Sequence, residues 1–302
     1  MLKAMTIDAI LKYIDNNIEE KTIDINDLVN YSGYSRRYLQ LLFSKHTGIS
    51  IGKYIQRRRI TRAAMLLKST HLSIVTISER LLYDSQQTFT REFRKNTGYT
   101  PLQYRNSNIW TFRYQTGHRE SNDKLPELEL RYLPKIDFYG APILFEETIP
   151  YTGARSQDKW GIVKKMLSRG KDRLFISNNI YRGEKNLEKF SVRAIPWGEN
   201  RPPNKNEIIS EGIYAYFVYK GEIKDYISHI NKIYLNVLPY YGLQKENTYD
   251  LEIISQNNDK SFNFEYYLPV HKEEYVDYKI EHSTDYIADI CYHAISLHLA
   301  EE

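Results

Sequence analysis

An internal repeat in the first hundred residues constrains the fold of this 302-residue chain more than any other feature of its sequence. Seven positions recur at a spacing of fifty residues, from Ser35, Leu39, Phe43, Lys45, Thr47, Gly48 and Tyr54 to Ser85, Phe89, Phe93, Lys95, Thr97, Gly98 and Tyr104. Three upstream positions recur at a spacing of 49, from Asp24, Ile25 and Leu28 to Ser73, Ile74 and Ile77. Because self-similarity at a fixed period indicates repeated structural units, the sequence predicts two copies of one helical unit.

Local signals outline two helices in each copy. Asp24 and Ser73 can cap the free N–H groups of a short first helix, and Ser35 and Ser85 can cap a second one. Glycine at 48 and 98 ends the second helices, because it adopts the left-handed conformation at low cost. Apolar residues at helical spacing predict a buried stripe of Leu39, Leu42 and Phe43 in one copy and of Phe89 and Phe93 in the other. Each copy is therefore predicted to be a helix-turn-helix.

The opposite faces of the two second helices carry side chains that suit base recognition. Arginine matches the paired acceptors of guanine in the major groove, and a glutamine amide matches the donor and acceptor of adenine. We predict DNA contacts from Arg36, Arg37, Gln40, Lys45, Gln86, Gln87, Thr88, Thr90, Arg91 and Lys95. The alternative is that both faces are merely solvated, but amide-rich faces at matched positions of a repeat argue against it.

A longer helix is predicted between the copies, from Ile51 to about Lys68. Ile55, Ala63, Leu66 and Leu67 can face inward along it, whereas Arg57, Arg58, Arg59 and Arg62 project outward in several directions. Some of these arginines would contact phosphates and others would form internal ion pairs, and the sequence does not divide them. Recognition helices on one rigid connector could enter successive major grooves about one helical turn, ~34 Å, apart, so a monomer could read a two-part site.

Charge supports a polyanionic partner for the front of the chain. Residues 1–110 contain 17 Lys and Arg against 9 Asp and Glu, whereas residues 111–302 contain 25 against 29. Neutralised phosphates release counterions, so a basic module of this size favours nucleic acid, although many basic domains simply have charged surfaces. No apolar run reaches the ~18 residues that a membrane helix needs. A lone cysteine, Cys291, excludes an internal disulfide and Cys-rich zinc sites.

The rear of the chain has the alternating pattern of strands. A polar linker is predicted over 111–125, and four later segments alternate in polarity: 128–132, 190–195, 213–219 and 262–268. Helices are predicted over 157–169 and 223–238, and the loop 198–208 separates two halves of similar strand, helix, strand, strand order. We therefore predict a multidomain chain, with an all-α double helix-turn-helix domain over 1–110 and an α+β domain with a duplicated unit over 126–270.

The front half resembles the DNA-binding domain of AraC/XylS transcription regulators. The resemblance spans Asp24 to Arg105 and rests on the blocks GYSRRYLQ, TGISIGKYIQRRRI, YDSQQTFTREFRK and TGYTPLQYR. These blocks are closest to the subgroup that contains Rob, MarA, SoxS and TetD. The resemblance implies a cytoplasmic, nucleoid-associated regulator that binds double-stranded promoter DNA, recruits RNA polymerase and activates stress, efflux or resistance genes, with no cofactor and no enzymatic activity.

The first recognition helix departs from that subgroup. Where the subgroup usually has Trp and, three residues on, Gln-Arg, this chain has Arg37, Gln40 and Leu41. Leucine cannot donate a hydrogen bond to guanine. We therefore predict an altered preference in the half-site that the first recognition helix reads, while the second helix matches the subgroup.

The rear half resembles the GyrI-like effector-binding domain. The resemblance rests on residues 212–221, the helix after them, Leu238-Pro239 and the strand 265–270. In drug-sensing members a glutamate in the last strand binds lipophilic cations within an aromatic cavity, and Glu265 is the matching position. Walls for a hydrophobic cationic small molecule are then predicted from Trp160, Trp197, Tyr216, Tyr266 and Tyr267. A vestigial or protein-facing domain is the alternative.

The tail 271–302 extends beyond that resemblance. Ile287, Ile290, Cys291, Ala294 and Leu297 share one face of a predicted helix from Thr284 to Ala300. We expect this helix to pack on its own domain rather than form a dimer. Metal binding by Cys291, His293 and His298 is not expected, because side chains two residues apart on a helix do not converge.

Two other functions fit parts of the sequence. A non-specific architectural DNA-binding protein would share the basic front half but would ignore base sequence. A hydrolytic GyrI-like domain fused to a DNA-binding module could use Glu265 or the pair Glu146 and Glu147 as an acid or base, although no nucleophile elbow or phosphate loop accompanies them.

Overall fold

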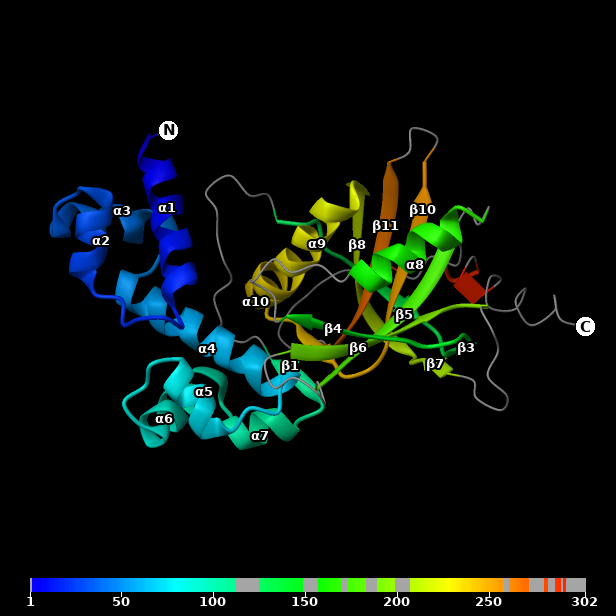
Figure 1. Cartoon of the computed structure of the whole chain (residues 1–302), viewed down its shortest axis with the longest axis horizontal. Coiled ribbons are helices and arrows are strands. Elements are labelled where there is room, and N and C mark those ends of the chain that lie inside the picture. Colours follow the sequence, from blue (N-terminus) through cyan, green and yellow to red (C-terminus); the bar gives the residue numbers. More distant parts are fainter. Residues whose placement is uncertain are drawn as a thin grey trace, which may run out of the picture.

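The computed structural model describes residues 2–111, 125–148, 157–169, 173–182, 189–198, 207–257, 261–271, 280–281, 286–288 and 290–291. A helical front half is followed by a sheet-rich rear half, as the sequence predicts (Figure 1). Within the described ranges, no helix is both long enough and apolar enough to cross a membrane.

The front half consists of helices around a long central rod, α4. The helices are α1 (Leu2–Asn17), α2 (Ile25–Ser32), α3 (Arg36–Thr47), α4 (Ile51–Ser69), α5 (Ile74–Arg80), α6 (Gln86–Thr97) and α7 (Pro101–Asn106). Helices α1 to α3 lie at one end of α4, and α5 to α7 lie at the other (Figure 1). The repeat did not predict α1, and the short helix α7 contains the repeated Tyr104, which corresponds to Tyr54 at the start of α4. The apolar side of α1 packs on the first unit through Ile7, Ile10, Leu11 and Ile14.

The predicted caps are confirmed in both copies of the repeat. Asp24 accepts a hydrogen bond from the first N–H of α2, and Ser73 caps α5 by accepting from Thr76. Ser35 and Ser85 accept from the third residues of α3 and α6. Gly48 and Gly98 end these helices in the left-handed region, with φ of 77° and 82°. Each recognition helix therefore begins and ends where its sequence predicts.

The copies differ in the turn between their two helices. The first copy turns at Gly33, with φ of 70°. The second copy places Leu82 in the same region, with φ of 59°, and it is the only non-glycine residue with positive φ in the described part of the chain. The one-residue shift in the repeat therefore falls where the two turns have different geometry.

One large, mostly antiparallel sheet dominates the rear half. The strands are β1 (Ile109–Thr111), β2 (Glu129–Leu133), β3 (Ile136–Phe138), β4 (Ile143–Thr148), β5 (Arg173–Arg182), β6 (Lys189–Pro196), β7 (Glu207–Ile209), β8 (Gly212–Gly221), β9 (Gln244–Glu246), β10 (Asp250–Gln256), β11 (Phe262–His271) and β12 (Ile280–Glu281). In the described residues the order is β12-β2-β8-β11-β10-β5-β6-β4, with β9 pairing to both β1 and β11. The four predicted strands correspond to β2, β6, β8 and β11.

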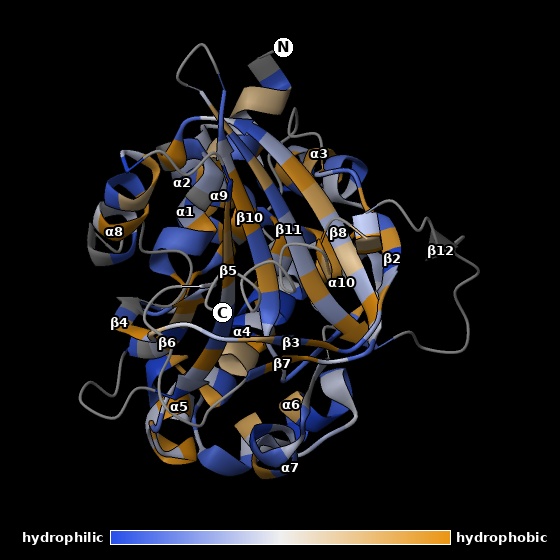
Figure 2. Ribbon diagram, turned by 90° about the vertical axis from the view of Figure 1, so that its right-hand side faces the viewer, coloured by the Kyte–Doolittle hydropathy of each residue, from blue (hydrophilic) through white to orange (hydrophobic). Residues whose placement is uncertain are grey.

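Each face of this sheet has its own core. Four short or medium helices cover one face: α8 (Gln157–Leu167), α9 (Ile223–Lys232), the π-helical turn η1 (Ile233–Val237) and α10 (Leu238–Tyr241). The pair β3 and β7 and the helical residues Tyr286 and Ile290 contribute to the core on the other face. Hydrophobic and hydrophilic bands alternate along β8, β10 and β11 (Figure 2), so successive side chains serve different faces. Of the predicted tail, Ala294, Leu297, His293 and His298 lie outside the described residues.

The two halves meet through α4 and through β1. From Ile60 to Ser69 every side chain of α4 is buried, since this segment packs on α5 to α7 and also contacts β5 and β6. The strand β1, at the end of the predicted first domain, pairs with β9 of the rear half. Across this contact, Arg182 of β5 donates to the Arg105 carbonyl at 2.6 Å. Within the front half, Lys68 at the end of α4 donates to the Ser107 carbonyl at 2.5 Å. The connector of the recognition helices is therefore also the platform for the rear half.

We expect Gly98→Ala to destabilise the second helix-turn-helix by about 1 kcal/mol, since an added Cβ disfavours the left-handed conformation. A Cβ at this position would meet no neighbour within 4 Å, so the cost comes from the backbone alone. Gly52→Ala is the control, because Gly52 is an exposed residue of α4 and alanine is the better helix former there by up to about 1 kcal/mol. Urea unfolding should show opposite signs for the two variants, and equal signs would contradict this account.

Candidate nucleic-acid interface and small-molecule site

All ten predicted DNA-contacting residues lie on α3 and α6. Arg36, Arg37, Gln40 and Lys45 are exposed on α3. On α6, Gln86, Gln87, Arg91 and Lys95 are exposed, and Thr88 and Thr90 are half-buried. Behind these faces, Leu39, Phe43, Phe89 and Phe93 are fully buried, as predicted, whereas Leu42 of the predicted stripe is half-buried. Each helix therefore packs one side into its unit and presents a polar, basic side to the solvent.

The exposed side of α6 forms a shallow hollow. It is lined by Gln86, Gln87, Thr90, Arg91, Arg94, Lys95 and Thr100, of which Arg94 and Thr100 were not among the ten. Thr88 has a structural role beside it, because its hydroxyl accepts a hydrogen bond from the capping Ser85 at 3.0 Å. The hollow presents amide, hydroxyl and guanidinium groups together, which are the groups that contact base edges and phosphates.

Leu41 is exposed on the predicted recognition face of α3. Its side chain is 67% accessible, beside the exposed Gln40. An apolar side chain at such a position can contact the methyl group of thymine but cannot hydrogen-bond to any base.

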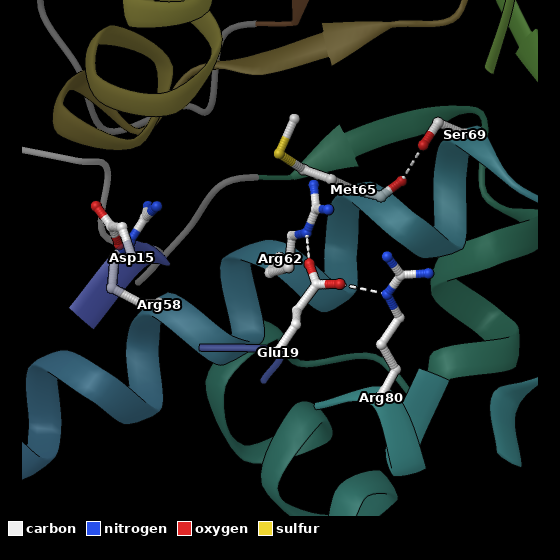
Figure 3. Close-up of polar contacts among 7 residues, drawn as sticks. All are labelled: Asp15, Glu19, Arg58, Arg62, Met65, Ser69 and Arg80. Atoms are coloured by element: carbon white, nitrogen blue, oxygen red, sulfur yellow. Dashed lines mark hydrogen bonds and ion pairs between the residues drawn. The ribbon is translucent and has the colours of Figure 1, made fainter. Parts of the chain in front are cut away.

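Of the four α4 arginines that the sequence left undivided between phosphate contacts and internal ion pairs, two are buried in ion pairs. Arg58 is 3% exposed and its Nε donates to Asp15 of α1 at 2.7 Å. Arg62 is 7% exposed and donates to Glu19, which also accepts from Arg80 of α5 (Figure 3). These two residues are therefore among the internal ion-pair partners that the sequence analysis expected without identifying them, and the carboxylates come from the end of α1 and the segment after it, which the repeat does not include. Arg57 and Arg59 are half-buried.

Glu19 joins three segments of the front half. It lies just after α1 and contacts the connector α4 through Arg62 and the second unit through Arg80. Burial raises the pKa of Glu19, but the charges and hydrogen bonds of both arginines outweigh this effect and hold its pKa below the ordinary value. A second contact, from Gln56 of α4 to Glu92 of α6, ties the rod to the second recognition helix. These contacts set the relative position of α3 and α6.

The six predicted ligand residues do not share one site, because they lie on opposite faces of the sheet. Glu265, Tyr216, Tyr267 and Trp197 face the core beneath β3 and β7, whereas Trp160 and Tyr266 face the core under α8 and α9. The residues of β11 alternate in direction, so Glu265 and Tyr266 necessarily point apart.

The Glu265 carboxylate is partnered within the chain. Tyr216 donates its hydroxyl to Oε2 at 2.9 Å, and Arg173 of β5 donates to Oε1 at 3.2 Å. Arg131 of β2 lies against Tyr216, with its guanidinium carbon 3.3 Å from the ring centroid. The sequence analysis missed Arg131 and Arg173, although charged residues facing the apolar side of a strand were a visible signal.

The helix-covered face holds a buried polar cluster that the sequence analysis also missed. Asp250 and Glu252 are 3% and 2% exposed. Asp250 accepts from Tyr266 and from the Asn178 N–H, and Glu252 accepts from Lys159 at 2.5 Å. Burial raises the pKa of Asp250 to about 6. Two acids at alternate positions of an otherwise apolar strand were the available signal.

Comparison with known proteins identifies a related module in each half. A model described as "Helix-turn-helix domain" matches residues 28–107, and one described as "GyrI-like small molecule binding domain" matches residues 182–271. The F1 operon positive regulatory protein of Yersinia pestis is 40% identical over 275 residues, which cover 91% of each chain.

Two further proteins match the front of the chain. The multiple antibiotic resistance protein MarA of Salmonella typhimurium is 37% identical over 123 residues, which cover 41% of this chain and 90% of MarA. The solved C-terminal domain of AraT, a response regulator from Geobacillus stearothermophilus, is 31% identical, with a TM-score of 0.32, covering 33% of this chain and 83% of that domain.

We expect Glu19→Gln to destabilise the front half by about 3 kcal/mol, because Arg62 would remain buried without its charged partner. The neighbouring Glu20→Gln is the control, since Glu20 is exposed and its loss should change stability by less than about 0.5 kcal/mol. Chemical unfolding measures both variants. If Glu19→Gln unfolds like Glu20→Gln, the bridge between the units does not carry the stability assigned to it.

We expect the protein to become more stable against unfolding as pH rises from 7 to 9, because of Lys68 at the end of α4. Burial, together with Arg182 and Lys245, lowers the pKa of Lys68 from 10.5 to about 8. A buried base with a lowered pKa loses its proton in the folded state before it does so in the unfolded chain, so stability increases as pH rises through 8.

Unfolding at pH 7, 8 and 9 tests this for Lys68→Met, whose stability should rise less with pH than that of the unsubstituted protein. Lys53→Met, at an exposed position of the same helix, should keep the original pH dependence. An unchanged slope in Lys68→Met would be evidence against the role of Lys68.

Proposed function

Because the chain belongs to the AraC family of DNA-binding transcription regulators, we propose that it activates transcription from promoters carrying one asymmetric, two-part site. The observation that carries this proposal is the pair of capped helices α3 and α6, whose polar faces are exposed and whose relative position is set by buried contacts to α4. A GyrI-like domain follows the DNA-binding domain in the same chain.

Each recognition helix would read its own half of the site. In α6, Gln86 and Gln87 lie in the first turn, where a helix-turn-helix contacts base edges, and Arg91 can reach guanine one turn later. In α3, Arg36, Arg37 and Gln40 have the corresponding place, with Leu41 beside them. Lys45 and Lys95, in the last turns, would contact phosphates.

One copy of the chain would cover the whole site. Because the Glu19 bridge and the α4 rod connect the two units, α3 and α6 can enter successive major grooves without a second protein copy. The two helices carry different side chains, so the two halves of the site would differ in sequence.

Activation is favoured by the character of the relatives. The Yersinia relative, whose alignment covers 91% of both chains, is named a positive regulatory protein. The Salmonella relative MarA is named a multiple antibiotic resistance protein. By analogy, the proposal includes recruitment of RNA polymerase to stress, efflux or resistance promoters.

The rear half would consist of two duplicated units and would bind a small cation near Glu265. The sheet order supports the duplication. In each half the first strand in sequence lies beside the third, and the third lies beside the second: β4-β6-β5 in one half and β8-β11-β10 in the other. The Glu265 carboxylate lies beside the rings of Tyr216 and Tyr267 on the same face of the sheet, which supports the cation site. Trp160 and Tyr266 would not belong to this site, since they face the other core.

Selection from random DNA, followed by sequencing, tests the DNA-reading proposal. We expect a two-part motif, with Leu41→Arg changing only the half-site read by α3 and Gln87→Ala changing only the half-site read by α6. Each change should shift the preference for the affected base by about 1–3 kcal/mol. The exposed Leu102→Arg, on α7, is the control for an added charge and should leave the motif unchanged.

Two outcomes would contradict the proposal. Binding that ignores sequence and weakens steeply with salt would instead indicate an architectural DNA-binding protein. Transcription in vitro, with the selected site placed upstream of a weak promoter, should increase when the protein is added, and a decrease would overturn the assignment as an activator.

A further inference from the structure

Three tyrosine rings enclose the guanidinium of Arg131. Its central carbon lies 3.3 Å from the centroid of the Tyr216 ring, 4.7 Å from that of Tyr286 and 5.8 Å from that of Tyr267. The rings come from β8, from β11 and from the helical residues after β12, so only the folded domain brings them together. The faces of aromatic rings attract cations, most strongly where water is excluded. The three rings therefore form a cation cage.

Few polar groups hold the guanidinium within this cage. Its Nη1 donates to the Tyr267 hydroxyl and its Nη2 donates to Glu129, both at 2.9 Å. The side chain of Arg131 is 15% exposed, and its buried Nε has no hydrogen-bond partner. Structural arginines are usually held by a bidentate carboxylate pair. Here the π faces of the rings provide most of the surroundings of the charge.

The carboxylate of the proposed cation site lies next to the cage. Tyr216 both stacks on Arg131 and donates its hydroxyl to Glu265, so one ring connects the cation to the acid. Arg173 neutralises the other oxygen of Glu265 from the neighbouring strand β5. Aromatic faces, a carboxylate and a planar cation are thus all present, but the cation belongs to the chain itself.

We propose that Arg131 is a built-in occupant of a cation-binding cage formed by Tyr216, Tyr267 and Tyr286, and that an external planar cation enters only by displacing it. This inference rests on the proposed cation site of the rear half. It names the chemical class of the ligand, a flat amidinium- or guanidinium-like cation, and gives the site a resting state in which it is already filled.

Displacement of Arg131 would act on strand β2, near the edge of the sheet. Arg131 lies in β2, which pairs with β8 on one side and, among the residues that the structure describes, only with the two-residue β12 on the other. In the sequence, β2 is the first strand after residues 112–124, which connect it to β1 and hence to the front half. Loss of the cage contacts would therefore loosen the strand nearest in sequence to the DNA-binding domain.

Calorimetric titration of the full chain with benzamidine, whose amidinium is planar like guanidinium, tests the proposal. We expect Arg131→Ala to bind benzamidine at least tenfold more tightly than the unsubstituted protein, because the cage is then open. Arg131→Met is the control, since an uncharged side chain of similar length should keep the cage filled and show no gain. In the Arg131→Ala background, Tyr216→Leu should abolish the gained binding.

A second variant, Arg131→Lys, tests the proposal if Arg131→Ala does not fold. Arg131→Lys keeps the stem and the charge, but its ammonium cannot stack flat on Tyr216, so benzamidine should displace it more easily than arginine. Binding by Arg131→Lys that equals that of the unsubstituted protein would contradict the proposal.

Two other results would overturn it in distinguishable ways. Equally tight binding by the unsubstituted protein and Arg131→Ala would reject the built-in occupant but keep the cation site. No binding by a folded Arg131→Ala protein would reject both. DNA binding is measured on the same samples. If it keeps its sequence preference, the DNA-reading proposal stands whichever of these two results is found.

Discussion

The bridge from Glu19 to Arg62 and Arg80 is the contact on which the arrangement of the DNA-reading surface depends. It connects the segment after α1, the rod α4 and the second unit through α5, and both arginines donate to the same carboxylate. A charge buried in this way is costly unless it is paired, so the three segments have one favourable relative position. Two recognition helices can read a two-part site only if such a position exists.

The rod α4 has a second role, because the rear half packs on it. The C-terminal part of α4 is buried all round, between α5 to α7 and the strands β5 and β6. Lys68, Arg105 and Arg182 lie at this junction and donate to backbone carbonyls. A change in the rear half can therefore reach the element that spaces α3 and α6 through direct contacts.

Two polar clusters of the rear half lie on opposite faces of the sheet. On the helix-covered face, Asp250 and Glu252 are buried with tyrosines and Lys159. On the other face, Glu265 and Arg131 share Tyr216. The alternation of side chains along β10 and β11 keeps these clusters apart, although their residues are close in sequence. Residues that look like one pocket in the sequence therefore serve two sites.

The sequence by itself determined the local structure of the front half, including the caps at Asp24, Ser35, Ser73 and Ser85, the glycine ends of α3 and α6, and their buried and exposed faces. These features depend on neighbours a few residues away, and the repeat displays them twice. Tertiary structure alone decided which arginines of α4 are buried, on which face each rear aromatic lies and that Arg131 enters the tyrosine cage. These outcomes depend on partners such as Glu19 and Tyr286, which are distant in sequence and are brought close only by packing.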